Sequence, residues 1–175
     1  MLIRLLVLSL FFPAFLFSTT VLTDSVKKYD AFSIAYFYDK QNLFSIEDVP
    51  ALEFHEAPNQ FSFGYREAAA WFKIELLNKS QTDAYVLYFT EPLWEEFDLY
   101  EASDKGWKIH HAGLLTSLEE RQINDVNPAF FISVPQGESK TFYLRGKSVS
   151  SQVGEFQIYS EEEFFRPTRF SITHI

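Results

Sequence analysis

Short runs in which apolar and polar residues alternate limit the folds that this chain can adopt. The clearest run, Trp71-Phe72-Lys73-Ile74-Glu75-Leu76, is followed by the turn-forming residues Asn78-Lys79-Ser80. Because successive side chains of a strand point to opposite faces, a two-residue period bounded by turn formers predicts a β-strand with one buried face. The side chains expected in the core are those of Phe72, Ile74 and Leu76.

Similar runs recur along the chain and are separated by turn signals such as Ser103-Asp104-Lys105-Gly106 and Pro135-Gln136-Gly137-Glu138. Further strands are predicted over residues 31–39, 84–89, 97–101, 107–112, 129–134, 141–145 and 155–159. No long amphipathic helix lies between them, and aromatic residues, which favour strands, make up 18% of the chain. The pattern predicts an all-β fold, either a sandwich or a barrel. One short helical turn is expected near residues 46–49, before Pro50.

The N-terminus has the three-part layout of a secretory signal peptide. Arg4 precedes an apolar block over residues 5–17, and small polar residues follow at Ser18 to Thr20. The block contains Pro13 and is shorter than the roughly 20 apolar residues that a membrane-spanning helix needs. We therefore predict a signal peptide over residues 1–18, followed by one domain.

Charge and cysteine content exclude several classes of function. The chain has 24 acidic and 15 basic residues, a formal net charge of −9. Such a surface repels phosphate backbones, so we expect no nucleic acid as a partner. The chain has no cysteine, which excludes thiol catalysis, cysteine-ligated zinc, iron–sulfur chemistry and lipid attachment to a cysteine. We expect no cofactor.

A series of short motifs in a fixed order resembles one family. The series is Phe63-Gly64-Tyr65, Trp71-Phe72-Lys73, Asn78, Phe97-Asp98-Leu99-Tyr100, Gly106-Trp107, Gly113, Pro128, Pro135-Gln136-Gly137-Glu138 and Tyr143-Leu144-Arg145. It is similar to the second type of extracellular domain of bacterial seven-transmembrane receptors with diverse intracellular signalling modules. The resemblance implies an antiparallel β-sandwich of jelly-roll type, with about eight strands, like that of carbohydrate-binding modules. It implies a jelly-roll ligand-binding sensor domain over residues 30–164 and a C-terminal segment over residues 165–175 that leads toward a membrane region. It also implies two partners, a seven-transmembrane region and a cytoplasmic output module such as a diguanylate cyclase or histidine kinase, in a longer protein or as separate chains.

Strand alternation places several polar and aromatic side chains on the face away from the core. The predicted ligand-binding residues are Trp71, Lys73, Tyr100, Tyr143 and Arg145. Aromatic rings stack on sugar faces or cations and arginine binds carboxylates with two hydrogen bonds, so the expected ligand is a carbohydrate or small carboxylate. In the alternative interpretation, Trp71 packs under a loop and Arg145 forms a structural pair with Asp98 or Glu75.

Other aromatic and histidine residues are weaker candidates. Trp94 and Trp107 lie beside turns, where each ring either meets a ligand or packs against a hairpin. His110 and His111 are adjacent on one predicted strand and so face opposite sides, which makes them poor co-ligands of a metal. With His55 and His174 they match no metal-binding motif, and we expect no metal site.

The predicted function is a non-catalytic, ligand- or stimulus-sensing ectodomain of a bacterial membrane signalling receptor. It is expected in the periplasm, at the outer face of the inner membrane. No Gly-x-Ser-x-Gly turn is present to hold a serine nucleophile. The main alternative is a free periplasmic carbohydrate-binding or accessory module without a signalling partner; a small exported hydrolase that uses two carboxylates is the third.

Overall fold

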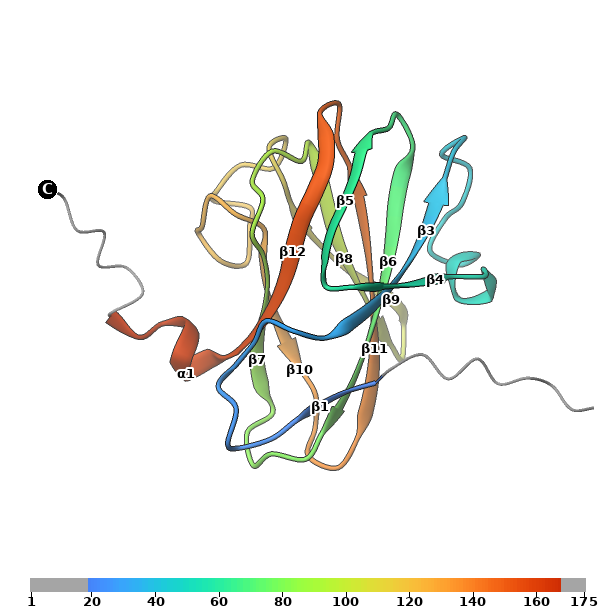
Figure 1. Cartoon of the computed structure of the whole chain (residues 1–175). Coiled ribbons are helices and arrows are strands. Elements are labelled where there is room, and N and C mark those ends of the chain that lie inside the picture. Colours follow the sequence, from blue (N-terminus) through green and yellow to red (C-terminus); the bar gives the residue numbers. More distant parts are fainter. Residues whose placement is uncertain (1–18, 168–175) are drawn as a thin grey trace, which may run out of the picture.

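The computed structural model describes residues 19–167, which form two β-sheets packed face to face (Figure 1). The strands are β1 (Thr20–Leu22), β2 (Lys28–Tyr29), β3 (Ser33–Asp39), β4 (His55–Pro58), β5 (Gln60–Tyr65), β6 (Ala69–Asn78), β7 (Ala84–Phe89), β8 (Glu96–Ser103), β9 (Gly106–Ala112), β10 (Ala129–Ser133), β11 (Ser139–Lys147) and β12 (Ser151–Ser160). A 3-10 turn spans Val49–Ala51, and the short helix α1 spans Glu161–Phe164. The all-β sandwich prediction is confirmed. The predicted signal peptide and residues 168–175 lie outside the described part.

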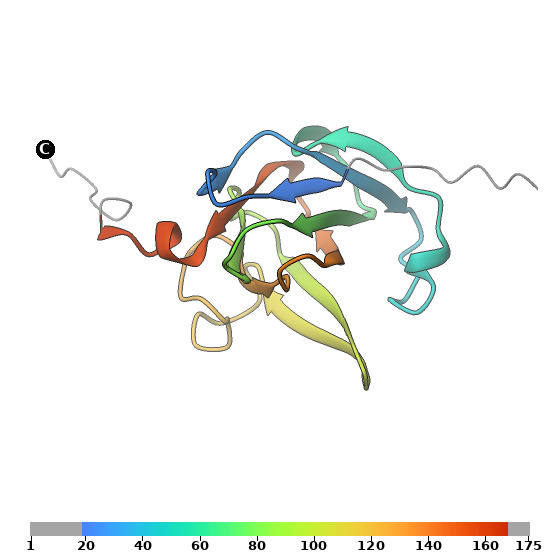
Figure 2. The same ribbon diagram turned by 90° about the horizontal axis from the view of Figure 1, so that it is seen from below.

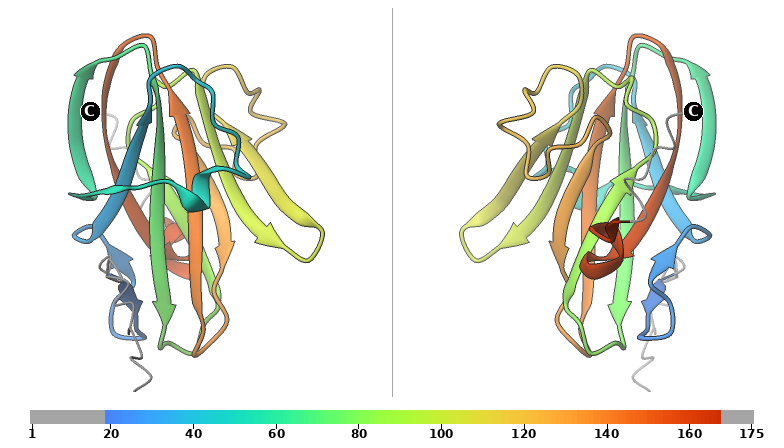
Figure 3. Two further views of the ribbon diagram at one scale, coloured as in Figure 1. Left: turned by 90° about the vertical axis from the view of Figure 1, so that its right-hand side faces the viewer. Right: turned by 90° about the vertical axis from the view of Figure 1, so that its left-hand side faces the viewer.

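The first sheet, here called sheet A, has the strand order β4-β3-β6-β11-β8-β9, and β1 runs parallel to the end of β6. The second, sheet B, has the order β10-β7-β12-β2, with β5 also paired to β12. The other pairings between these strands are antiparallel. The view from below in Figure 2 shows the two layers, and Figure 3 shows the β8–β9 hairpin projecting from one side.

The main core fills the space between the inner faces of the two sheets. Phe72, Ile74 and Leu76 of β6 are all fully buried there, as the alternation predicts. Rings from sheet B meet them: Phe72 and Phe156 lie edge to face with centroids 5.1 Å apart. Burying a side chain of this size stabilises the fold by about 1.5–3 kcal/mol, so this aromatic layer is a main source of stability.

A second cluster lies on the outer face of sheet A, under residues 40–54, which we call the cover segment. Ile46, Val49 and Phe54 of this segment pack against Trp71 and Tyr143 of the sheet. The carboxylate of Asp39 starts the segment by accepting the backbone N–H groups of Leu43 and Phe44, each at 2.9 Å. The 3-10 turn begins at Val49, three residues later than predicted. Pro50 occupies one of its first positions, where a backbone N–H has no partner within the helix and the lack of one in proline is tolerated.

The chain leaves sheet B through the short helix α1. The hydroxyl of Ser160 accepts the backbone N–H of Glu163 at 3.4 Å and so caps the helix. The ring of Phe164 is fully buried against Tyr88 and Tyr159, with centroids 5.7 and 5.6 Å away. These contacts fix the exit of the chain on the outer face of sheet B. Within residues 19–167, no helix is long and apolar enough to cross a membrane.

Candidate functional site

The five residues predicted to bind ligand share the outer face of sheet A. In the strand register, Tyr143 of β11 lies between Lys73 of β6 and Tyr100 of β8. Arg145 lies beside Trp71 in the next row. Strand alternation therefore brings the five side chains together, as expected from the sequence. The cover segment lies over part of this face, so the side chains differ in how far they are exposed to solvent.

The aromatic members of this face are packed against one another. Trp71 is 1% exposed and Tyr143 is 7% exposed. The Trp71 and Tyr100 rings lie 5.3 Å apart, and Trp107 meets Tyr143 edge to face at 5.8 Å. Burial raises the pKa of Tyr100 to about 12 and also raises that of Tyr143, so both phenols stay neutral at physiological pH. These rings act as packing for the cover segment in this structure, and the indole N–H of Trp71 is buried without a hydrogen-bond partner.

The two cations of the predicted site have carboxylate partners. Arg145 forms an ion pair, as the alternative interpretation expects, but its partner is Glu96 and not Asp98 or Glu75: Arg145 Nη1 lies 2.7 Å from Glu96 Oε2. Lys73 Nζ lies 2.5 Å from Glu75 Oε1. The five-residue ligand site stays a prediction.

Trp94 and the adjacent histidines take different positions. Trp94 is fully buried in the main core and its indole N–H donates to the Val153 carbonyl at 3.1 Å, so it offers no surface to a ligand. His111 Nδ1 lies 2.9 Å from Asp98 Oδ1 on the outer face, whereas His110 Nε2 lies 3.7 Å from Glu101 Oε2 on the other side. The two rings face opposite ways, as predicted. No group of three or more metal-ligating side chains is found among the described residues.

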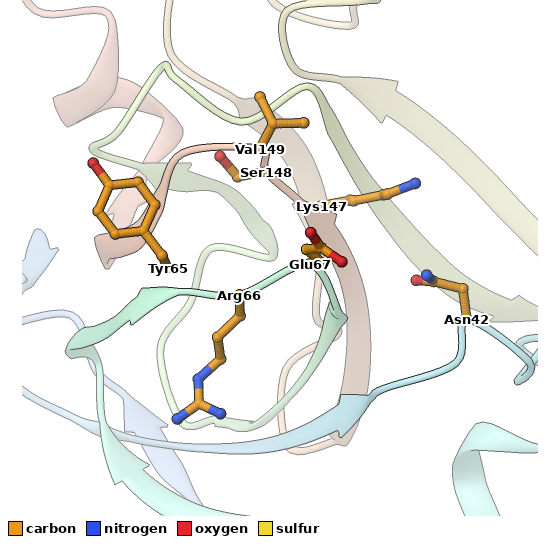
Figure 4. Close-up of a pocket in the computed structure, with 7 residues that line it drawn as sticks. All are labelled: Asn42, Tyr65, Arg66, Glu67, Lys147, Ser148 and Val149. Atoms are coloured by element: carbon orange, nitrogen blue, oxygen red, sulfur yellow. The ribbon is translucent and has the colours of Figure 1, made fainter.

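A pocket of about 640 Å³ opens at one end of the sandwich (Figure 4). We call it the end pocket, and it is formed where the β5–β6 connection, the β11–β12 connection and the start of the cover segment meet. Its lining residues are Asn42, Tyr65, Arg66, Glu67, Lys147, Ser148 and Val149. These residues were not predicted as a site from the sequence, although Tyr65 belongs to one of the family motifs.

Buried hydrogen bonds hold the walls of the end pocket. Gln152 is fully buried, and its Nε2 donates to the carbonyl oxygens of Arg66 and Ala68 at 3.2 and 2.7 Å. Ser148 Oγ donates to the Leu93 carbonyl at 3.0 Å. On the third side, Asn42 has a φ of 53°, a left-handed conformation that asparagine tolerates, and its Oδ1 accepts the Ala69 N–H at 3.1 Å. The three connections are thus tied to the rest of the fold.

The end pocket lies far from the points where the described chain begins and ends. Strand β12 starts at Ser151, just after the pocket residues, and runs ten residues to Ser160, where α1 follows. At the usual rise per residue this is about 33 Å. Strand β1 pairs with the end of β6, while the pocket adjoins the start of β6 (Figure 1). The pocket and the chain exits therefore occupy opposite ends of the sandwich.

Comparison with known proteins identifies the family. No curated protein gives a significant match to the chain. A family model described as 7TMR-DISM extracellular 2 matches residues 32–160, which include every strand from β3 to β12. The match agrees with the resemblance carried by the sequence motifs and covers most of the chain. The chain belongs to the 7TMR-DISM extracellular 2 family, a family of extracellular domains of seven-transmembrane receptors.

Proposed function

We propose that this chain is the sensory ectodomain of a bacterial membrane signalling receptor, and that it acts by binding a ligand without chemical turnover. The observation that carries the proposal is the family match over residues 32–160. Membership of a family of receptor ectodomains implies an exported domain with a membrane region as its partner. The finer parts of the proposal are a periplasmic position at the outer face of the inner membrane, a cytoplasmic output module, and a saccharide or small carboxylate as ligand.

The strand order supports a jelly-roll fold for this domain. The eight strands from β5 to β12 interleave between the sheets: sheet B contains β5-β12-β7-β10 and sheet A contains β6-β11-β8-β9. We interpret this arrangement as a jelly roll of the kind found in lectin domains. On this interpretation the sandwich is a rigid frame that presents ligand-binding groups on one face or at one end.

Signalling requires that the ligand binds two states of the receptor with different affinity. Strand β12 is the direct covalent link between the end pocket and the C-terminal exit, and it pairs with β5, β7 and β2 along its length. A shift of the β11–β12 connection on binding would therefore move a strand whose far end carries α1. We propose this strand as the route from the ligand to the membrane region.

A ligand screen tests the sensing function. The purified chain is screened by thermal unfolding against saccharides and small carboxylates. A ligand that binds the native state at 100 times its Kd stabilises it by about 2.7 kcal/mol and raises the melting temperature. The same samples are analysed by chromatography for cleavage. Reproducible hydrolysis that disappears when one carboxylate is replaced would overturn the non-catalytic proposal.

The coding region beyond residue 175 separates a receptor from a free module. Seven apolar segments downstream support the receptor, whereas a stop codon together with ligand binding supports the free carbohydrate-binding or accessory module.

A further inference from the structure

We propose that residues 45–54 of the cover segment, here called the lid, open away from the predicted ligand face while the rest of the domain stays folded. The inference rests on the proposed ligand-sensing function and adds how that face becomes accessible. Figure 3 (left) shows the cover segment crossing the outer face of sheet A. The closed lid keeps a ligand from the buried rings of Trp71 and Tyr143, so binding at these rings requires that the lid moves.

The lid contacts the sheet through apolar side chains. In the described part of the chain, each hydrogen bond of residues 45–54 joins two residues of the lid itself. Ser45 Oγ donates to Asp48 Oδ2 at 2.9 Å, and the backbone N–H of Leu52 donates to the Val49 carbonyl at 3.1 Å. The side chains that pack against the sheet are those of Ile46, Val49 and Phe54. Because its own hydrogen bonds stay intact when it moves, the lid can leave the sheet as one unit.

Both ends of the lid are fixed to the fold. Before the lid, the carboxylate of Asp39 accepts the backbone N–H groups of Leu43 and Phe44, each at 2.9 Å. After it, His55 begins β4, which pairs with β3. A segment with fixed ends and few polar contacts to the fold beneath it is the kind that opens locally, at a lower free energy than the whole domain.

The indole N–H of Trp71 lacks a partner while the lid is closed. It is buried without a hydrogen bond to any of residues 19–167, whereas the indole N–H of Trp94, in the main core, donates to the Val153 carbonyl at 3.1 Å. A buried donor without a partner destabilises the closed form, because the same N–H binds water once it is exposed. An acceptor oxygen of a ligand would also satisfy it. A ligand that makes this contact binds the open form alone and shifts the population toward it.

Thiol labelling of single-cysteine variants tests the lid, since the chain has no cysteine of its own. Ala35 is 2% exposed in the cluster under the lid, and Ala70 is fully buried in the main core. Ala35→Cys and Ala70→Cys are labelled with iodoacetamide in native buffer. We expect Ala35→Cys to react about 10-fold faster or more, because lid opening requires less free energy than global unfolding. Low urea concentrations should change its rate little, since the opening exposes little surface, but should steeply raise the rate of Ala70→Cys.

Two substitutions in these backgrounds distinguish lid opening from unfolding. Ile46→Ala removes a contact of the closed lid, so Ala35→Cys should react about 10-fold faster still. Ile74→Val weakens the main core, so it should speed Ala70→Cys by about 2- to 10-fold and leave Ala35→Cys unchanged. Val49→Cys carries the thiol on the underside of the lid and should show the same small urea dependence as Ala35→Cys. It gives a second measurement of the same opening, and melting temperatures show that each variant is folded.

The outcomes separate this inference from the proposed function. If Ala35→Cys and Val49→Cys react at the rate of Ala70→Cys and with its urea dependence, the lid opens only when the whole domain unfolds. The inference is then wrong, as it also is if Ile74→Val speeds Ala35→Cys as much as Ala70→Cys, while ligand sensing stands. If the lid opens locally but the ligand screen finds cleavage in place of binding, the sensing function is wrong and the lid remains a property of the fold.

Discussion

Replacing Trp71 with alanine tests whether the outer face of sheet A is packing or an open binding surface. The side chain is 1% exposed under the cover segment, so truncation removes most of its buried surface and leaves a cavity. Replacing a buried aromatic side chain by alanine costs about 3–5 kcal/mol. Trp71 also has a buried N–H without a partner, and removing an unsatisfied donor returns part of that cost. We therefore expect a loss near the lower limit, about 3 kcal/mol.

The assay is unfolding of the purified variant, followed by circular dichroism with heat and with urea. In a protein of this size each kcal/mol changes the melting temperature by about 2–4 °C, so Trp71→Ala should melt about 6–12 °C lower. Arg145→Ala is the matched comparison. Its pair with Glu96 is partly exposed and contributes about 1 kcal/mol or less, so this variant should lose at most about 2–4 °C.

If Trp71→Ala lowers the free energy of unfolding by less than about 1 kcal/mol, as an ordinary surface substitution does, Trp71 is not packed under the cover segment. That result would mean that the cover segment does not rest on Trp71 in solution and that the predicted ligand face is open. Arg145→Ala then becomes the informative variant for function. It stays folded in either case, so a loss of ligand affinity in it reports the use of this face directly.

Three further predictions concern single positions. Gly154→Ala should cost about 1–3 kcal/mol by overpacking, because its Cβ would lie 2.2 Å from Phe89 Cζ; adding Phe89→Leu should recover part of it, and strictly additive costs in urea unfolding would contradict the contact. Asn78 is fully buried and its Nδ2 donates to two carbonyl groups at 2.7 Å, so Asn78→Ala should lose about 1–3 kcal/mol of stability in urea unfolding, and a loss below about 0.5 kcal/mol would contradict these bonds. Burial lowers the pKa of His110 from 6.5, so the unfolded chain binds more protons and stability falls as pH drops through that value. His110→Gln should flatten this fall between about pH 5 and 7 in stepped urea titrations, and an unchanged slope would remove His110 as its source.

Alternation predicts the long central strands because their period is repeated several times. For β6, with ten residues, the inner and outer faces were assigned correctly from Phe72 to Leu76. The strands β1, β2 and β4 have two to four residues, too few for a period to be distinguished from chance. Strand β5 was missed as well, although Phe61, Phe63 and Tyr65 alternate along it and it carries the family motif that ends at Tyr65.

The exposure of the predicted site could not be read from the same pattern. Alternation indicates on which side of a strand a side chain lies, and it placed Trp71 and Tyr143 correctly on the outer face. It does not indicate what lies over that face. The residues that cover it, among them Ile46 and Phe54, belong to an irregular segment whose path depends on the Asp39 carboxylate and on the sheet itself. The end pocket is a stronger case, since its lining comes from three connections that only the strand order brings together.

The placement of the two sites follows from how a sandwich uses its surfaces. The inner faces of the sheets are committed to the aromatic core, and the centre of the outer face of sheet A is occupied by the cover segment. Charged side chains without partners are costly inside such packing, but they are tolerated at the connections, where water hydrates them. One end of the sandwich carries the chain exits, and the other carries the end pocket. In the proposed receptor this arrangement places the end pocket away from the membrane side, and β12 joins the two ends with a single continuous strand.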